Sequence, residues 1–265
     1  MNIIEAIILG IVQGITEFLP VSSSGHLQIV KALMGVELEE NIAFDLMLHA
    51  GTVCSTILVL WPEIMKIFKG VFSRTFNEEH AYVLKIALSM IPVAIVGFTL
   101  EDSLNAMLSS SVILIIVGSM LLLTAILLAY ASFAKPRERE TISFRDSFII
   151  GIAQAVAVMP GISRSGATIA TGLILGNKKE SVAQFSFLMV LVPILGKSLL
   201  SLVGGDAAWD SVGLVPMAAG FLASFVVGVL ACKFMINIIK RGKLIWFAYY
   251  CLVAALFSYI LYFFN

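Results

Sequence analysis

The chain has 265 residues, of which 60% are hydrophobic and only 13% are charged, and its 17 basic side chains balance 17 acidic ones. A soluble domain carries about twice that share of charged residues on its surface. The composition therefore excludes a secreted disulfide scaffold, a nucleic-acid-binding protein and a disordered chain. It indicates an integral membrane protein.

Six apolar stretches are predicted to be membrane-spanning helices. A helix needs about 20 apolar residues to cross the hydrocarbon core of a bilayer. Continuous apolar runs, rather than alternation with a period of two, predict helices and not a barrel. The predicted spans are 42–61, 82–100, 112–133, 184–203, 211–232 and 244–265. The predicted fold class is all-α and polytopic.

Two further apolar regions are interrupted by polar residues. Glu17 and a serine-rich segment separate 6–16 from 18–30, and Arg164 separates 147–163 from 165–177. A half-helix of about 13 residues reaches about 20 Å, which is less than the roughly 30 Å core. Irregular backbone at membrane depth is tolerated only where protein or trapped water satisfies it. We therefore expect two re-entrant helical hairpins.

The two broken regions resemble each other at a shift of 141 residues. The shift places Gly10, Ile11, Gln13, Ser22, Ser24 and Gly25 on Gly151, Ile152, Gln154, Ser163, Ser165 and Gly166. These six identities in one register indicate an internal repeat. We expect one membrane domain over 1–265, with the first copy at about 1–134 and the second at about 142–265.

The charges of the loops predict that the two copies are inverted. Lys and Arg gather in 62–81, 135–145 and 240–243, whereas 101–111 and 204–212 contain acidic residues and no basic ones. By the positive-inside rule, the basic segments are cytoplasmic. The hairpins then enter from opposite faces, and their polar loops meet near the midplane as in an inverted-topology repeat.

The residues at these loops suit the binding of an anion. Ser24-Gly25 and Ser165-Gly166 are each expected to begin a half-helix with serine as its cap. The free N–H groups at two helix starts would bind an anion, and the guanidinium of Arg164 adds a positive fork suited to phosphate. Such a site indicates phosphoryl-group chemistry.

Three side chains of the first loop could act on a bound phosphate. Ser23 or His26 could attack phosphorus while the other moves protons. Glu17 could orient His26 or hold a divalent cation, and a structural ion pair between Glu17 and Arg164 is the alternative. His49, in the next span, is expected to be a packing residue.

The segment Gln13–His26 resembles the first signature of the undecaprenyl-diphosphate phosphatase family, the bacitracin-resistance proteins, and Pro160–Thr168 resembles the second, PGxSRSxxT. The resemblance covers essentially the whole chain. It implies removal of one phosphate from undecaprenyl diphosphate, the recycling of a cell-wall carrier lipid, and bacitracin resistance. It also implies a divalent cation, Mg or Ca, and a site in the cell (inner) membrane that is open to the external or periplasmic side.

The resemblance further implies roles for the residues of the two signatures. The catalytic set is Glu17, Ser23, His26 and Arg164, with Glu17 also the metal ligand. The substrate-binding set is Gln13, Ser22, Ser24, Ser163, Ser165 and Thr168. The nucleophile is either Ser23 or His26, with a slight preference for His26. Glutamine at position 13 weakens any mechanism that needs two carboxylates for the metal.

Other functions fit parts of the pattern. A transporter or lipid flippase would also use an inverted repeat with broken helices, and a structural membrane protein would need none of these polar groups. The other class of membrane lipid phosphatases needs a histidine after its Ser-Arg element, and none follows Arg164. The expected partners are the lipid diphosphate and the bilayer, and small residues on the spans would permit a homodimer.

Overall fold

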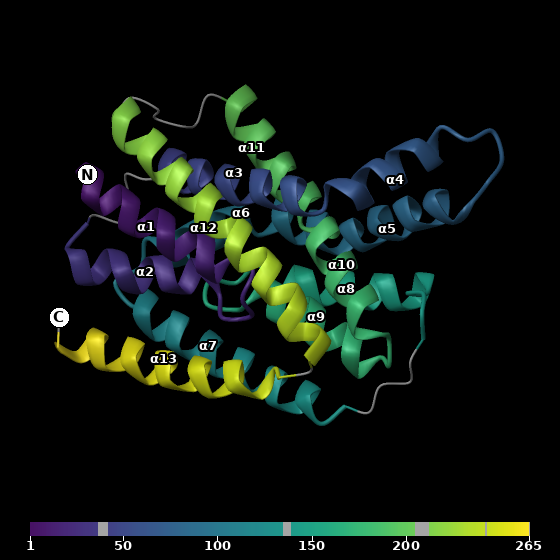
Figure 1. Ribbon diagram of the computed structural model, residues 1–265. Helices are drawn as coiled ribbons and strands as arrows, with labels where there is room; N and C mark the ends of the chain where they lie inside the picture. The colour runs from purple at the N-terminus through teal and green to yellow at the C-terminus, as the bar shows by residue number, and fades with distance from the viewer. Residues whose placement is uncertain (37–41, 135–138, 205–211, 242, 265) are drawn as a thin grey trace.

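The computed structural model describes residues 1–36, 42–134, 139–204, 212–241 and 243–264, which form thirteen α-helices (Figure 1). The described residues contain no strand, only a single bridge between Arg139 and Asn177. Five helices are long and apolar enough to cross a membrane, or six if one bent pair is counted as a span. The predicted all-α polytopic class is confirmed.

Both predicted broken regions are helix–break–helix units. The first consists of α1 (Ile3–Thr16) and α2 (Ser23–Met34), and the second of α8 (Phe144–Val156) and α9 (Arg164–Ile174). None of these four helices reaches the length of a span, as the sequence predicts.

The repeat extends to the starts of the two units. Asn2 caps α1 through the backbone N–H of Glu5, and Ser143 caps α8 through that of Asp146. The two cap residues are themselves 141 positions apart. An N-cap side chain stabilises a helix start because it accepts a hydrogen bond from an N–H group that has no intrahelical partner.

The long helices agree with the predicted spans in place but not in every boundary. They are α3 (Ile42–Val59), α5 (Glu78–Thr99), α7 (Ile113–Ser132), α10 (Lys179–Met189), α11 (Leu191–Gly204), α12 (Leu214–Arg241) and α13 (Ile245–Phe264). The predicted span 184–203 is divided at Val190, the C-cap of α10.

Two predicted loops are helical instead. The segment 62–81 holds most of α4 (Trp61–Val71) and the start of α5, and α6 (Glu101–Leu108) occupies most of 101–111. The chain bends by 76° between α3 and α4, where Pro62 lies in the first turn of the new helix, a position that needs no N–H donor. Charges used for the topology prediction at 135–138, 205–211 and 242 lie outside the described residues.

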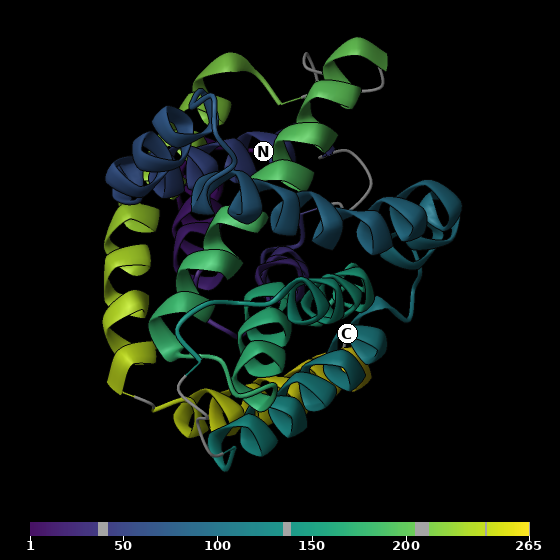
Figure 2. The same ribbon diagram turned by 90° about the vertical axis from the view of Figure 1, so that its right-hand side faces the viewer.

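Each hairpin packs its first helix on a long helix of the other half. The α1 helix lies along α12, α8 lies along α5, and α7 pairs with α13, as both views show (Figures 1 and 2). Glycines allow the close approach: a Cβ on Gly10 would lie 2.5 Å from the carbonyl oxygen of Gly220, and one on Gly151 would lie 2.4 Å from that of Ser89.

The Gly10 contact gives a stability prediction. In Gly10→Ala the new methyl group overlaps the Gly220 carbonyl, so we expect a loss of about 1–3 kcal/mol of unfolding free energy, the usual cost of overpacking. Thermal unfolding in detergent measures it. The control is Gly97→Ala in α5, where a Cβ meets nothing within 4 Å. Equal melting of the two variants would show that the α1–α12 contact does not restrict residue 10.

The two breaks hold each other through reciprocal contacts. A Cβ on Gly25 would lie 3.2 Å from Cα of Gly161, and one on Gly166 would lie 3.3 Å from Cβ of Pro20. Pro20 and Gly161 are equivalent positions of the repeat, being 141 residues apart. The predicted meeting of the two polar loops is confirmed.

Candidate active site

Each second half-helix begins at a serine cap. The Ser22 hydroxyl accepts a hydrogen bond from the N–H of Gly25 at 3.2 Å, and the Ser163 hydroxyl accepts one from Gly166 at 3.0 Å. The caps therefore lie two residues before the serines expected from the sequence. The amides that directly follow each cap belong to the first helical turn and have no partner within the helix.

Ser22 adopts an unusual backbone conformation. Its φ is 70°, and among the described residues no other non-glycine residue has a positive φ. Such a conformation is strained for an L-residue and persists only where the surroundings enforce it, as at many functional sites. Here it turns the chain sharply ahead of Ser23.

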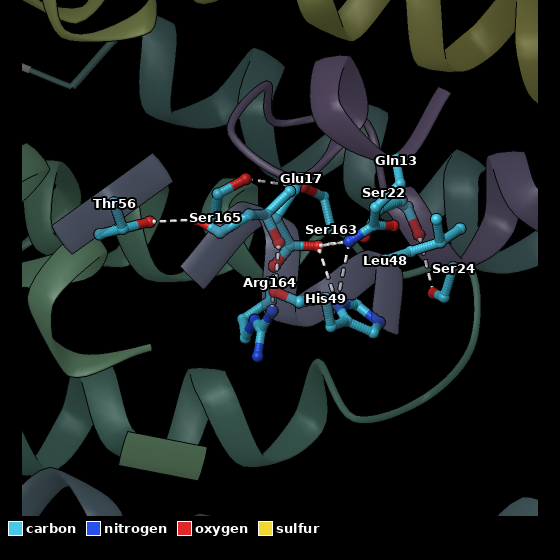
Figure 3. Close-up of polar contacts among 12 residues, drawn as sticks. Gln13, Glu17, Ser22, Ser24, Leu48, His49, Thr56, Ser163, Arg164 and Ser165 are labelled. Atoms are coloured by element: carbon cyan, nitrogen blue, oxygen red, sulfur yellow. Dashed lines mark hydrogen bonds and ion pairs between the residues drawn. The ribbon is translucent and has the colours of Figure 1, made fainter. Parts of the chain in front are cut away.

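The carboxylate of Glu17 lies at the centre of the site. Glu17 follows the last residue of α1, and its side chain is only 6% exposed. Its Oε2 accepts hydrogen bonds from the Ser23 hydroxyl at 2.6 Å and from Nε2 of Gln13 at 3.0 Å. Its Oε1 accepts one from the guanidinium of Arg164 (Figure 3). The structure thus joins predicted residues of both hairpins.

The Glu17–Arg164 ion pair also has an accessible side. A buried carboxylate requires a compensating charge, which Arg164 supplies from α9. The Arg164 side chain is 24% exposed and lines a pocket together with Glu17 and Ser165. The guanidinium can therefore reach a ligand in the pocket as well as the carboxylate.

The pocket combines polar and apolar walls. Its other polar lining residues come from α3 and α10, and its apolar lining comes mainly from the region where α10 meets α11. These residues are Thr52, Thr56, Ser186, Phe18, Val53, Phe187, Val190, Leu191 and Ile194. Such a lining suits an amphiphile with a charged head and a hydrocarbon tail.

His26 lies apart from this network. Its Nδ1 is 2.8 Å from the carbonyl oxygen of Ser22, and its Nε2 is 2.8 Å from the hydroxyl of Tyr250, on which the ring also stacks. In the described structure neither nitrogen contacts Glu17 or Arg164. The contacts favour Ser23 as the nucleophile, against the preference for His26. Tyr250 lies in an aromatic-rich span, so its sequence context carries no signal for this role.

The remaining predicted binding residues mostly support the loops. Ser165 donates to the carbonyl of Leu19 at 3.0 Å, and Ser24 accepts from the N–H of Gly161 at 3.4 Å. Thr168 donates to the carbonyl of Arg164 at 2.9 Å and lies 2.5 Å from the Ser186 hydroxyl. Of these three residues, Ser165 is the one that lines the pocket.

The expectation that His49 is a packing residue is wrong. Its Nδ1 lies 2.9 Å from Nε2 of Gln13 and 3.6 Å from Oε2 of Glu17 (Figure 3). A signal was present in the sequence: Asp45, His49, Thr52 and Thr56 are spaced by four, three and four residues, which places them on one polar face of α3.

Fold and site together define a polytopic helical membrane protein with a serine, a carboxylate and a guanidinium at two crossing helix breaks. The model of the family described as bacitracin resistance protein BacA matches residues 6–257, and the chain belongs to this family. It is 57% identical to an undecaprenyl-diphosphatase of Parabacteroides distasonis and 56% identical to one of Bacteroides thetaiotaomicron, with 97% of each chain covered. A protein of the same name from Methanosphaera stadtmanae is 37% identical, with 98% of each chain covered.

Proposed function

We propose that this protein is a membrane phosphatase that hydrolyses undecaprenyl diphosphate to undecaprenyl phosphate and phosphate, and thereby gives bacitracin resistance. The observation that carries the proposal is the contact of Ser23 and Arg164 with the two oxygens of one carboxylate, Glu17. Family membership and the names of the relatives support a phosphatase rather than a transporter.

In the first step, Ser23 attacks the terminal phosphorus of the lipid diphosphate. Its hydroxyl proton passes to Oε2 of Glu17, which already accepts that hydrogen bond at 2.6 Å. The bond from phosphorus to the bridging oxygen breaks, and the departing lipid phosphate takes the proton from Glu17. Arg164 and the free amides of α2 and α9 stabilise the charge on the transferring group.

In the second step, water hydrolyses the phosphoserine. Glu17 accepts a proton from the attacking water, the bond between phosphorus and Oγ of Ser23 breaks, and Oγ recovers the proton from Glu17. Inorganic phosphate leaves, and the resting site is restored. Both steps use the same carboxylate as base and then as acid.

A divalent cation fits the oxygens available beside Ser23. Gln13 is fully buried, and its Oε1 has no hydrogen-bond partner in the described structure. Together with the Glu17 carboxylate it offers hard oxygen ligands, and Mg²⁺ commonly adds substrate phosphate and water to one or two carboxylates. Among the described residues no cluster of three or more His, Cys, Asp or Glu forms a separate metal site. We propose that Glu17 and Gln13 hold Mg or Ca, which would neutralise phosphate charge.

The proposed location follows the same reasoning. The helices indicate a multi-pass membrane protein, and we propose the cell (inner) membrane, with the site open to the external or periplasmic side. The apolar wall formed by Phe187, Val190 and Leu191 would contact the isoprenoid tail. A homodimer stays a prediction from the small residues on the spans.

Phosphate release from lipid diphosphates of graded tail length tests the proposal. We expect purified protein in detergent to release phosphate with Mg or Ca and to lose this activity with a chelator. The same protein in liposomes distinguishes the transporter alternative. Lipid movement without hydrolysis, or chelator-insensitive release, would contradict the phosphatase mechanism.

A further inference from the structure

The amide of Gln13 links the catalytic carboxylate to a second helix. Its Nε2 lies 3.0 Å from Oε2 of Glu17 and 2.9 Å from Nδ1 of His49 in α3. The amide nitrogen carries two hydrogens, one for each of these acceptors. The same Oε2 accepts the hydroxyl proton of Ser23.

The donor at Gln13 fixes the tautomer of His49. An amide nitrogen only donates, so Nδ1 of His49 must accept, and a neutral ring carries its hydrogen on Nε2. The separation of 3.6 Å between Nδ1 and Oε2 of Glu17 is longer than a hydrogen bond. His49 therefore acts on Gln13 directly and on Glu17 through it.

Gln13 needs this outside contact. Gln13 and Glu17 lie one turn apart on the same helix, so the amide could rotate by half a turn and bring Oε1 toward the carboxylate. That rotation would replace an attractive contact at Oε2 with a repulsive one. His49 belongs to α3, whose backbone at this point is tied by a hydrogen bond of 2.9 Å from the Thr52 hydroxyl to the His49 carbonyl.

We infer that His49 is a positioning residue of the active site, which holds the Gln13 amide so that its nitrogen faces Oε2 of Glu17. The inference rests on the proposed roles of Glu17 and Ser23. His49 thereby keeps the base oriented toward Ser23 and leaves Oε1 of Gln13 as the uncommitted oxygen.

Two substitutions of similar shape separate this role from packing. His49→Met removes the acceptor, and we expect kcat to fall about 10–100-fold, the usual cost of losing such a supporting contact, with KM unchanged. His49→Gln places an amide oxygen near the same point and should restore most of kcat. If His49→Met does not give monodisperse protein, His49→Leu replaces it in the comparison.

A double-mutant cycle tests whether His49 acts through Gln13. In a Gln13→Ala background, His49→Met should cause no further loss of kcat. The control is His80→Met, which removes a histidine that lies 2.7 Å from Asn77 outside the site and should leave kcat unchanged. Full activity of His49→Met, or an undiminished loss in the Gln13→Ala background, would overturn the inference. Activity of Glu17→Ala in the same series would instead overturn the proposed function.

Discussion

Replacing Ser23 by alanine is expected to lower phosphate release by at least about 10³-fold, because loss of a nucleophile leaves only binding and charge stabilisation. The Ser23 hydroxyl lies 2.6 Å from Oε2 of Glu17 and is the hydroxyl best placed for activation by that base. Single-turnover measurements with a substrate labelled in its terminal phosphate give the rate. Ser132→Ala is the matched control, since this serine bonds only within α7, to the carbonyl of Leu128.

The chemistry of the intermediate distinguishes Ser23 from His26. A phosphoserine survives acid and is cleaved by base, whereas a phosphohistidine is cleaved by acid. We expect acid-stable label on the wild-type chain and none on Ser23→Ala. Acid-labile label that persists in Ser23→Ala would assign the nucleophile to His26 instead.

Arg164→Ala is expected to reduce kcat by about 10³-fold or more, within the range found for arginines that stabilise a transferring phosphoryl group. The substitution also leaves the Glu17 carboxylate, which is 6% exposed, without its cationic partner. Arg164→Lys should recover only part of the rate, because an ammonium keeps the charge but not the two-pronged geometry of the guanidinium. Steady-state phosphate release measures both variants.

The control for Arg164 is another arginine in an ion pair. Arg139 lies 3.6 Å from Asp146 at the start of α8, and its side chain is 51% exposed. Arg139→Ala should retain near wild-type activity, because an exposed pair contributes little. If Arg164→Ala kept its activity, the Glu17–Arg164 pair would have a structural role alone.

The sequence predicts those parts of the site that depend on local pattern. The short apolar segments around Glu17 and Arg164, and the shift that relates them, indicate the two breaks and their meeting. The bend at Leu60 and the division at Val190 were not predicted, because hydropathy measures how apolar a segment is and not its direction. Charged segments such as 62–81 read as loops, although amphipathic helices occupy most of this one.

Side-chain partners across helices lie beyond the reach of the sequence. The partner of Gln13 on α3 and the partner of His26 on α13 depend on how separate helices pack, and no spacing along the chain encodes that packing. A polar face on α3 indicates that His49 faces something polar. Only the packed structure identifies this neighbour as the amide beside Glu17.

The reciprocal contacts at the crossing have a consequence for how the substrate lies. Ser23 and Arg164 are 141 residues apart, and each is the first residue of its half-helix. A frame with approximate twofold symmetry would by itself accept a diphosphate in either direction. Because one half carries a hydroxyl where the other carries a guanidinium, only one direction presents the terminal phosphorus to the nucleophile. Two identical halves, such as an unduplicated ancestor would have paired, could not make that distinction.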